Sequence, residues 1–550
     1  MGNALFYDSS LQHCDEDSKP QRYLPGLLNG IRPKHDFVIS KRPDGSVLSL
    51  YGDDKWELWP YRTTPKQHSA LNFLVLHTTA KDDIKWLLFI LIYMTDTGNA
   101  GTVSPGSLIQ YMTLLRKLNV FSVNNNATPC QVLGTEKLLR QFSLQAVNSG
   151  QIVKLLIQLL TQLFSIGFDR TGINVINEST VDEIRLLKNS TVRSTKQHPV
   201  IPPRIFSYLL TQYWSIIDAV VPFMGQLDKF IRRCATDRGY ARHRSFQYRM
   251  GLRKNNYAAF FDEGVKEYKL GKLFKTFDVK SLMNLTRFLN RIQHTCKELI
   301  HAYSGMRDSE VLSLKIDCLH TENGRYGNTA HLLGETSKLV GQRKTAAWVT
   351  TAEIKKVLGV AQKIAKSIAN HKGFSINQTP LIVSVSYLEF GISQPPATEE
   401  ISVNGCFNKE GNQAVYLFDS GPLIIQENDI RDLERTNPLR AWREEAEFEI
   451  GKAWKTTSHQ WRRSLAFYIA QSGMVSLPTL KRQLQHASRE MSIYYCNGSG
   501  FSELFSDSDH FSQELRHTKP EADALAYIHN ILLSDEPLKG SHGQYVERFL

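Results

Sequence analysis

The segment from Ser458 to Tyr495 constrains this chain most, because it combines helix patterning with several reactive polar side chains. Apolar residues recur at helical spacing after Ser458, which is a suitable N-cap, and Gly473 is placed to end this helix. His459 and Arg462 stand three residues apart, so both side chains project from one face of the predicted helix.

Two further short helices are predicted downstream. The second begins near Ser476 and Pro478 and delivers His486 at its end, and the third carries Tyr495. Each residue alone is a weak indication, since a lone histidine or tyrosine is more often structural. Taken together, the three helices bring two histidines, an arginine and a tyrosine to one place.

These residue types suit phosphoryl transfer to tyrosine. A tyrosine hydroxyl, with an ordinary pKa of about 10, becomes a nucleophile when a neighbour accepts its proton and the transition-state charge is neutralised. Arginine is always charged and binds two phosphodiester oxygens with its forked guanidinium. Histidine can bind a further oxygen and move the proton. The pattern predicts attack by a tyrosine on a DNA phosphodiester.

A second arginine in a suitable setting lies upstream. Arg307 follows a Ser-Gly turn and opens a predicted helix, with Glu310 one turn further on. The segments SGMRDSEVLSL, HQWRR and QHASREMSIYY resemble, in order and spacing, the three sequence boxes of the tyrosine recombinase (phage integrase) family of site-specific integrases. This resemblance covers residues 198–500.

The resemblance implies a site-specific DNA recombinase and a set of catalytic residues. They are Arg307, Glu310, Lys338, His459, Arg462, His486 and Tyr495. The two arginines would hold the scissile phosphate, and Tyr495 would form a 3′-phosphotyrosyl bond. Glu310 would orient Arg307 or hold its helix.

The same resemblance implies roles for the histidines and for one lysine. His459 would transfer a proton, and His486 would bind a phosphate oxygen. In the family a lysine in a β-hairpin protonates the departing 5′ oxygen. A hairpin is predicted over residues 325–351, and Lys338 at its turn is our choice, with Lys344 as the alternative.

The expected partner is double-stranded DNA, bound by a homotetramer that passes through a Holliday junction, with accessory DNA-bending proteins a further expectation. No cofactor and no metal are expected, because no ligand set has metal-binding spacing. Seven scattered cysteines predict reduced thiols, and the longest apolar run, residues 86–94, is too short to span a membrane. We therefore expect a cytoplasmic, DNA-associated protein.

The chain departs from the family pattern at three positions near the nucleophile. Gln485 replaces the glycine that usually precedes the second histidine, and Met491 and Ser492 replace two threonines. Tyr494 and Tyr495 are adjacent and about 100° apart on a helix, so only one can face the phosphate. Spacing from His486 selects Tyr495.

A basic segment, residues 231–254, holds eight Lys or Arg against one Asp and is interleaved with aromatic residues. The net charge of +12 and a pI near 9.2 likewise favour a polyanionic partner. A solvated surface is the plain alternative, but phosphate contacts are predicted for a DNA-binding protein. The candidates are Arg242, Arg244, Arg249, Arg253 and Lys254.

The predicted fold is mainly α-helical with a small antiparallel β-sheet, comprising a helical core-binding domain and an α+β tyrosine-recombinase catalytic domain. Residues 1–70 are unassigned, although residues 47–59 could form a strand pair. The predicted boundaries are a DNA-clamping domain at 71–187, a linker at 188–203, a catalytic domain at 204–510 and a tail helix at 511–550. The catalytic domain is expected to hold an insertion at 351–455, which includes a charged helix over 429–450.

Two alternatives remain at this level. A type IB topoisomerase would use the same chemistry without pairing two sites, and a non-catalytic DNA-binding protein could share the fold. The sequence leaves open the target site and the choice between integration, excision and dimer resolution.

Overall fold

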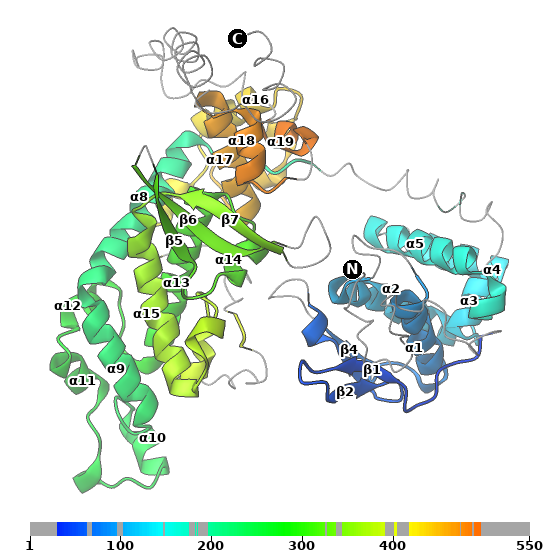
Figure 1. Cartoon of the computed structure of the whole chain (residues 1–550), viewed down its shortest axis with the longest axis horizontal. Helices are drawn as coiled ribbons and strands as arrows, with labels where there is room; N and C mark the ends of the chain where they lie inside the picture. The colour runs from blue at the N-terminus through cyan, green and yellow to red at the C-terminus, as the bar shows by residue number, and fades with distance from the viewer. Residues whose placement is uncertain are drawn as a thin grey trace.

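The structure is a computed structural model of the whole chain (Figure 1). It describes residues 30–62, 69–95, 103–146, 149–174, 182, 184, 196–324, 327–336, 344–390, 401–403, 417–472, 475–486 and 489–496. Two large hydrophobic cores form within these residues. The first is made of residues from Ile39 to Ile184, and the second of residues from Ile201 to Trp461. Lys338 and the predicted tail helix at 511–550 lie outside the described residues.

The first core begins with four short strands in two antiparallel pairs. β1 (Val38–Lys41) pairs with β2 (Val47–Leu50), and β3 (Lys55–Glu57) pairs with β4 (Ala70–Asn72). The prediction that residues 47–59 form a strand pair was wrong. β2 and β3 lie in this segment, but β2 pairs with β1 and β3 pairs with β4.

Six helices whose bounds lie within the described residues complete the first core. They are α1 (Thr78–Tyr93), α2 (Pro105–Asn124), α3 (Pro129–Gly134), α4 (Glu136–Ala146), α5 (Gly150–Ile166) and α6 (Phe168–Thr171). The apolar run at residues 86–94 lies in α1 up to Tyr93, and α1 is buried from residue 83 to 93. α2 begins after Ser104, whose Oγ accepts a hydrogen bond from the Ser107 N–H at 3.3 Å. α3 and α6, with 6 and 4 residues, are too short to display a helical period in the sequence.

The second core is built around α13 (Leu282–Ser304), whose C-terminal half is almost completely buried. It packs against α8 (Pro203–Val220), α15 (Ile354–Lys372) and α17 (Ser458–Ser472). The remaining helices are α9 (Met224–Thr236), α10 (Arg244–Arg249), α11 (Phe261–Glu267), α12 (Gly271–Thr276), α14 (Asp308–Ser313), α16 (Glu427–Thr436), α18 (Leu477–Gln483) and α19 (Arg489–Cys496).

The elements from α8 to α19 are called the second unit below. It contains an antiparallel sheet of three strands, in the order β5–β6–β7. The strands are β5 (Leu319–Gly324), β6 (Gly327–Thr336) and β7 (Lys344–Thr350). The β6–β7 hairpin was predicted and β5 was not, because its polar sequence lacks a clear alternation. A mainly helical chain with small antiparallel sheets is the predicted fold class, which is confirmed.

Residues 351–455, predicted as an insertion, supply much of the second core. The apolar face of α15 is buried there, as are Leu381, Ile382 and Val383. The charged helix predicted over 429–450 ends at Thr436, because Pro438 disfavours helical backbone at Asn437. Two 3₁₀ turns, Trp442–Glu444 and Ala446–Phe448, follow it.

Candidate active site

Arg307 is held at the start of α14 by Glu310. The carboxylate of Glu310 accepts a hydrogen bond from the backbone N–H of Arg307 at 2.7 Å and from its Nη1 at 2.6 Å. Both side chains are buried, with Glu310 1% exposed. A third residue, Thr336 at the end of β6, donates its hydroxyl to Glu310 Oε1 at 2.8 Å. Sequence reasoning missed Thr336, since nothing in its own segment shows that it meets Glu310.

Arg462 lies beside this pair and is 1% exposed. Its Nη1 donates to the Gly305 carbonyl at 2.6 Å and lies 4.0 Å from Glu310 Oε2, while Nη2 donates to the Leu484 carbonyl. Burial lowers the pKa of Arg462 to about 10, and the nearby charge of Arg307 acts in the same direction. Arg462 therefore keeps its charge at neutral pH.

Gly305 makes this approach possible. It ends α13 in the left-handed conformation, with φ of 67°, which favours glycine. A Cβ at this position would come within 2.9 Å of both Leu465 and Leu484. The short link from Gly305 to Arg307 thus brings the backbone of the first box against the α17–α18 region.

His486 and Tyr495 stand next to Arg462. The ring centroids of His486 and Tyr495 are 4.9 Å apart, and the Arg462 Cζ lies 5.4 Å from the centroid of the tyrosine ring. His486 Nδ1 is 3.0 Å from the hydroxyl of Ser492, which is fully buried. Ser492, which replaces a threonine of the family pattern, thus contacts the histidine directly.

Tyr494 and Tyr495 are separated as the spacing predicted. Tyr494 is 52% exposed and Tyr495 is half-buried against His486. The backbone carbonyl of Tyr494 accepts hydrogen bonds from Arg463 Nη1 and Gln197 Nε2. Tyr495 is thus the tyrosine that meets the buried arginine.

The other predicted residues are less closely joined. His459 is exposed, one turn before Arg462 on α17, and its ring stacks on that of His198. Lys338 lies outside the described residues, and the alternative, Lys344, is exposed where β7 begins opposite Thr336.

Gln485 stands in a backbone conformation that favours glycine. Its φ is 49°, in the left-handed region that a side chain disfavours. The side chain compensates by donating to the carbonyls of Ala347, at 3.2 Å, and Arg482, at 3.0 Å.

No protein-family model matches this chain, and no curated protein matches it. Two solved structures of the XerH site-specific recombinase are similar. One is a pre-cleavage complex with difH substrate, 14% identical, matched over 78% of this chain and 81% of that chain with a TM-score of 0.28. The other is a post-cleavage complex with palindromic difH substrate, 15% identical, matched over 82% and 97% with a TM-score of 0.26. TM-scores this low do not establish a common overall arrangement, so the functional assignment rests on the site itself.

The predicted DNA-binding residues lie on and beside α10, at the opposite end of the second unit from α18 and α19 (Figure 1). Arg244, Arg249 and Arg253 are exposed, and their guanidinium carbons lie 4.8 to 5.9 Å from the ring centroids of Tyr257, Phe246 and Tyr248, respectively. Lys254 is exposed as well.

Arg242 differs from this prediction. Its Nη2 donates to the Glu389 carbonyl at 2.9 Å and its Nη1 to the Phe390 carbonyl at 3.1 Å. Burial lowers the pKa of Arg242. These donors hold the chain together and are therefore not available to a phosphate.

Among the described residues, no helix is long and apolar enough to cross a membrane. The same residues contain no group of three or more His, Cys, Asp or Glu side chains arranged to hold a metal ion.

Proposed function

We propose that this protein is a site-specific DNA recombinase that cleaves and rejoins strands through a 3′-phosphotyrosyl intermediate. One observation carries the proposal: two buried arginines, Arg307 and Arg462, share a single carboxylate beside His486 and Tyr495. Unbalanced positive charge is costly to bury, and an anion such as a phosphodiester would neutralise it. The buried Nε of Arg462 has no hydrogen-bond partner among the described residues, so a phosphate oxygen can serve as its acceptor.

In the proposed reaction, the hydroxyl oxygen of Tyr495 attacks the phosphorus and the bond from phosphorus to the 5′ oxygen breaks. The tyrosine proton passes to His459 or to water, and a lysine returns a proton to the departing 5′ oxygen. Lys338 is our candidate, with Lys344 as the alternative. Because the phosphodiester is exchanged for a phosphotyrosyl ester, rejoining needs no external energy source.

The surrounding side chains stabilise the transition state. Arg307 and Arg462 hold the non-bridging oxygens while negative charge grows on them, an effect commonly worth several kcal/mol per group. His486 binds an oxygen, and its ring is oriented by Ser492. Glu310 fixes the fork of Arg307.

The proposed partner is double-stranded DNA, bound by a homotetramer with the helical unit at 71–187 clamping the face opposite the catalytic unit. The exposed arginines near α10 would add phosphate contacts. Accessory DNA-bending proteins and integration of a mobile element belong to the same proposal.

Recovery of covalently bound DNA tests this function. The protein is incubated with fragmented duplex genomic DNA, denatured, and the attached fragments are sequenced. We expect a common sequence ending in a 3′-phosphotyrosyl linkage. Tyr495→Phe should abolish the adduct without weakening DNA binding, whereas the matched variant Tyr494→Phe should retain it. Absence of any adduct, or its loss in Tyr494→Phe alone, would contradict the assignment.

The same assay separates the alternatives. A protein that binds DNA without catalysis gives no adduct. A type IB topoisomerase gives an adduct but relaxes supercoiled DNA and joins no pair of sites. Recombination of two copies of the recovered sequence on one plasmid would distinguish a recombinase from both.

A further inference from the structure

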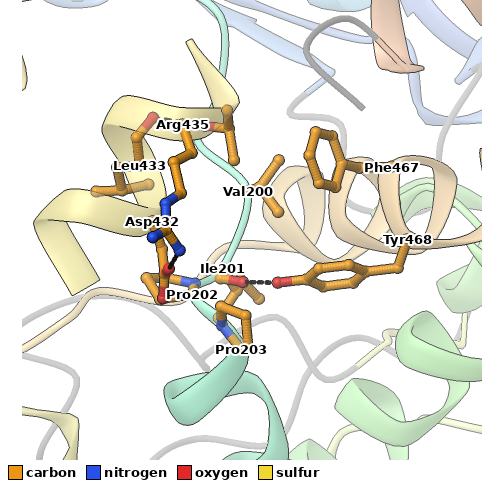
Figure 2. Close-up of a pocket in the computed structure, with 10 residues that line it drawn as sticks. Val200, Ile201, Pro202, Pro203, Asp432, Leu433, Arg435, Phe467 and Tyr468 are labelled. Carbon is orange, nitrogen blue, oxygen red and sulfur yellow. Dashed lines mark hydrogen bonds and ion pairs between the residues drawn. The ribbon is translucent and has the colours of Figure 1, made fainter. Parts of the chain in front are cut away.

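Residues 196–201 immediately precede α8, in the segment whose composition predicted a linker. Several hydrogen bonds hold this segment against the rest of the second unit. Arg440 Nη1 donates to the Gln197 carbonyl at 2.6 Å. The hydroxyl of Tyr468 donates to the Ile201 carbonyl at 2.6 Å, next to a cavity of about 20 Å³ (Figure 2). This stretch is therefore a fixed part of the second unit.

His198 in this stretch stacks on His459. The two ring centroids are 4.8 Å apart, and the ring planes differ by 6°. Burial lowers the pKa of His198, with Arg463 and Arg440 acting in the same direction and Glu447 opposing them. A neutral His198 ring can stack without repelling a proton on His459.

Gln197 contacts α19, the helix that carries Tyr495. Its Nε2 donates to the backbone carbonyl of Tyr494, in the last turn of α19, which also accepts from Arg463 Nη1 at 3.2 Å. Carbonyls in the last turn of a helix lack partners within the helix, so external donors determine how that turn is held. Adjacent residues of one segment thus contact both His459 and the residue preceding Tyr495.

We propose that Gln197 and His198 are positioning residues of the active site, with His198 setting the ring plane of His459 and Gln197 holding the turn of α19 that carries Tyr495. This inference rests on the proposed function. It also means that two adjacent residues of one segment contact His459 and the residue that precedes Tyr495.

Single-turnover cleavage tests the proposal, using a nicked duplex that carries the recovered site and traps the adduct. Small errors in placement of reacting groups cost large factors in rate, so we expect His198→Ala to slow adduct formation about tenfold. His198→Phe, which keeps a flat ring, should restore the rate to within about twofold of the unmodified protein. Gln197→Ala, which loses one hydrogen bond, should slow the reaction by about threefold to tenfold.

DNA affinity and the melting temperature are measured in parallel, and both should stay unchanged. His320→Ala is the matched control, because His320 is exposed on β5 and pairs with Glu322 away from the site. Full activity in His198→Ala would overturn the proposal. Equal loss in His198→Ala and His198→Phe would overturn it too, since the imidazole itself would then take part in the chemistry.

A measurement without DNA keeps the proposal separate from the proposed function. In protein with labelled histidines, the imidazole signal of His459, assigned through His459→Gln, should lose its ring-current shift in His198→Ala and keep one in His198→Phe. A signal unchanged in both variants overturns the positioning role whether or not the protein cleaves DNA. A changed signal in a protein that forms no adduct refutes the recombinase assignment but leaves the stacking contact in place.

Discussion

The second unit uses arginine in two opposite ways at its two ends. Around Tyr495, Arg307 and Arg462 are buried and share one carboxylate. Near α10, Arg244, Arg249 and Arg253 are exposed and lie over aromatic rings. Burial makes a charge costly and its interactions strong, which suits a single anion held in one geometry.

Exposed arginines work differently. Attraction between exposed arginines and phosphates is screened by salt and independent of base sequence, so under the proposed function these residues contribute affinity and orientation rather than chemistry. The comparison teaches that basic residues in this chain cannot be assigned one role from composition. Burial and hydrogen-bond partners separate the proposed active site from the proposed DNA-binding surface.

The largest effect is expected at the buried end. Arg307→Ala should slow adduct formation by about 10²- to 10³-fold at saturating DNA, because one group that stabilises the growing charge is lost. DNA affinity should change little. Single-turnover trapping and a binding titration measure the two quantities. A variant that binds DNA weakly but cleaves at the normal rate once saturated would show that Arg307 serves binding, as proposed for the exposed arginines, and not the reaction.

The exposed end should respond in the reverse manner. Replacing Arg244, Arg249 and Arg253 by Ala should reduce the log–log slope of affinity against salt by about 2.7, roughly 0.9 for each lost phosphate contact. The cleavage rate at saturating DNA should be unchanged. An unaltered slope would mean that these side chains are only solvated.

Arg242→Ala sharpens this test as a matched control in the same segment. Its guanidinium bonds the carbonyls of Glu389 and Phe390, so its loss should destabilise the protein by about 1–3 kcal/mol without altering the salt slope. Denaturant unfolding measures the first quantity and DNA titration the second. A slope change as large as that of an exposed arginine would return Arg242 to the binding surface.

A smaller effect is expected from Ser492→Ala. The hydroxyl meets His486 Nδ1 at 3.0 Å, so its removal should slow cleavage about tenfold by releasing the ring, while Ser492→Thr should retain most of the activity. Adduct formation under single-turnover conditions checks both variants. Equal loss in the two would show that packing around the buried side chain matters more than the hydrogen bond.

The smallest effect is expected from Gln485→Gly. Relief of the left-handed backbone should stabilise the protein by about 1 kcal/mol, and loss of the two side-chain hydrogen bonds should offset most of that. Unfolding in denaturant should therefore shift by less than about 1 kcal/mol. A large loss of stability would show that the glutamine contacts outweigh the backbone conformation.

Local features of the site were predictable from the sequence because they depend on neighbours in the chain. The spacing of apolar residues predicted α17, and Ser476 and Pro478 predicted the start of α18. The Ser-Gly turn before Arg307 likewise marked the end of α13. Spacing also selected Tyr495 over Tyr494 as the tyrosine that faces the other candidate residues.

Contacts between distant parts of the chain were decided only by the tertiary structure. Thr336 reaches Glu310 from another element, His198 meets His459 across 261 residues of sequence, and Arg242 donates to carbonyls 147 and 148 residues away. No local sequence pattern predicts these long-range contacts, because side-chain partners depend on how helices and strands pack. The sequence determined which residues are candidates for the chemistry and on which helices they stand, and packing decided which of them are buried, paired and held in place.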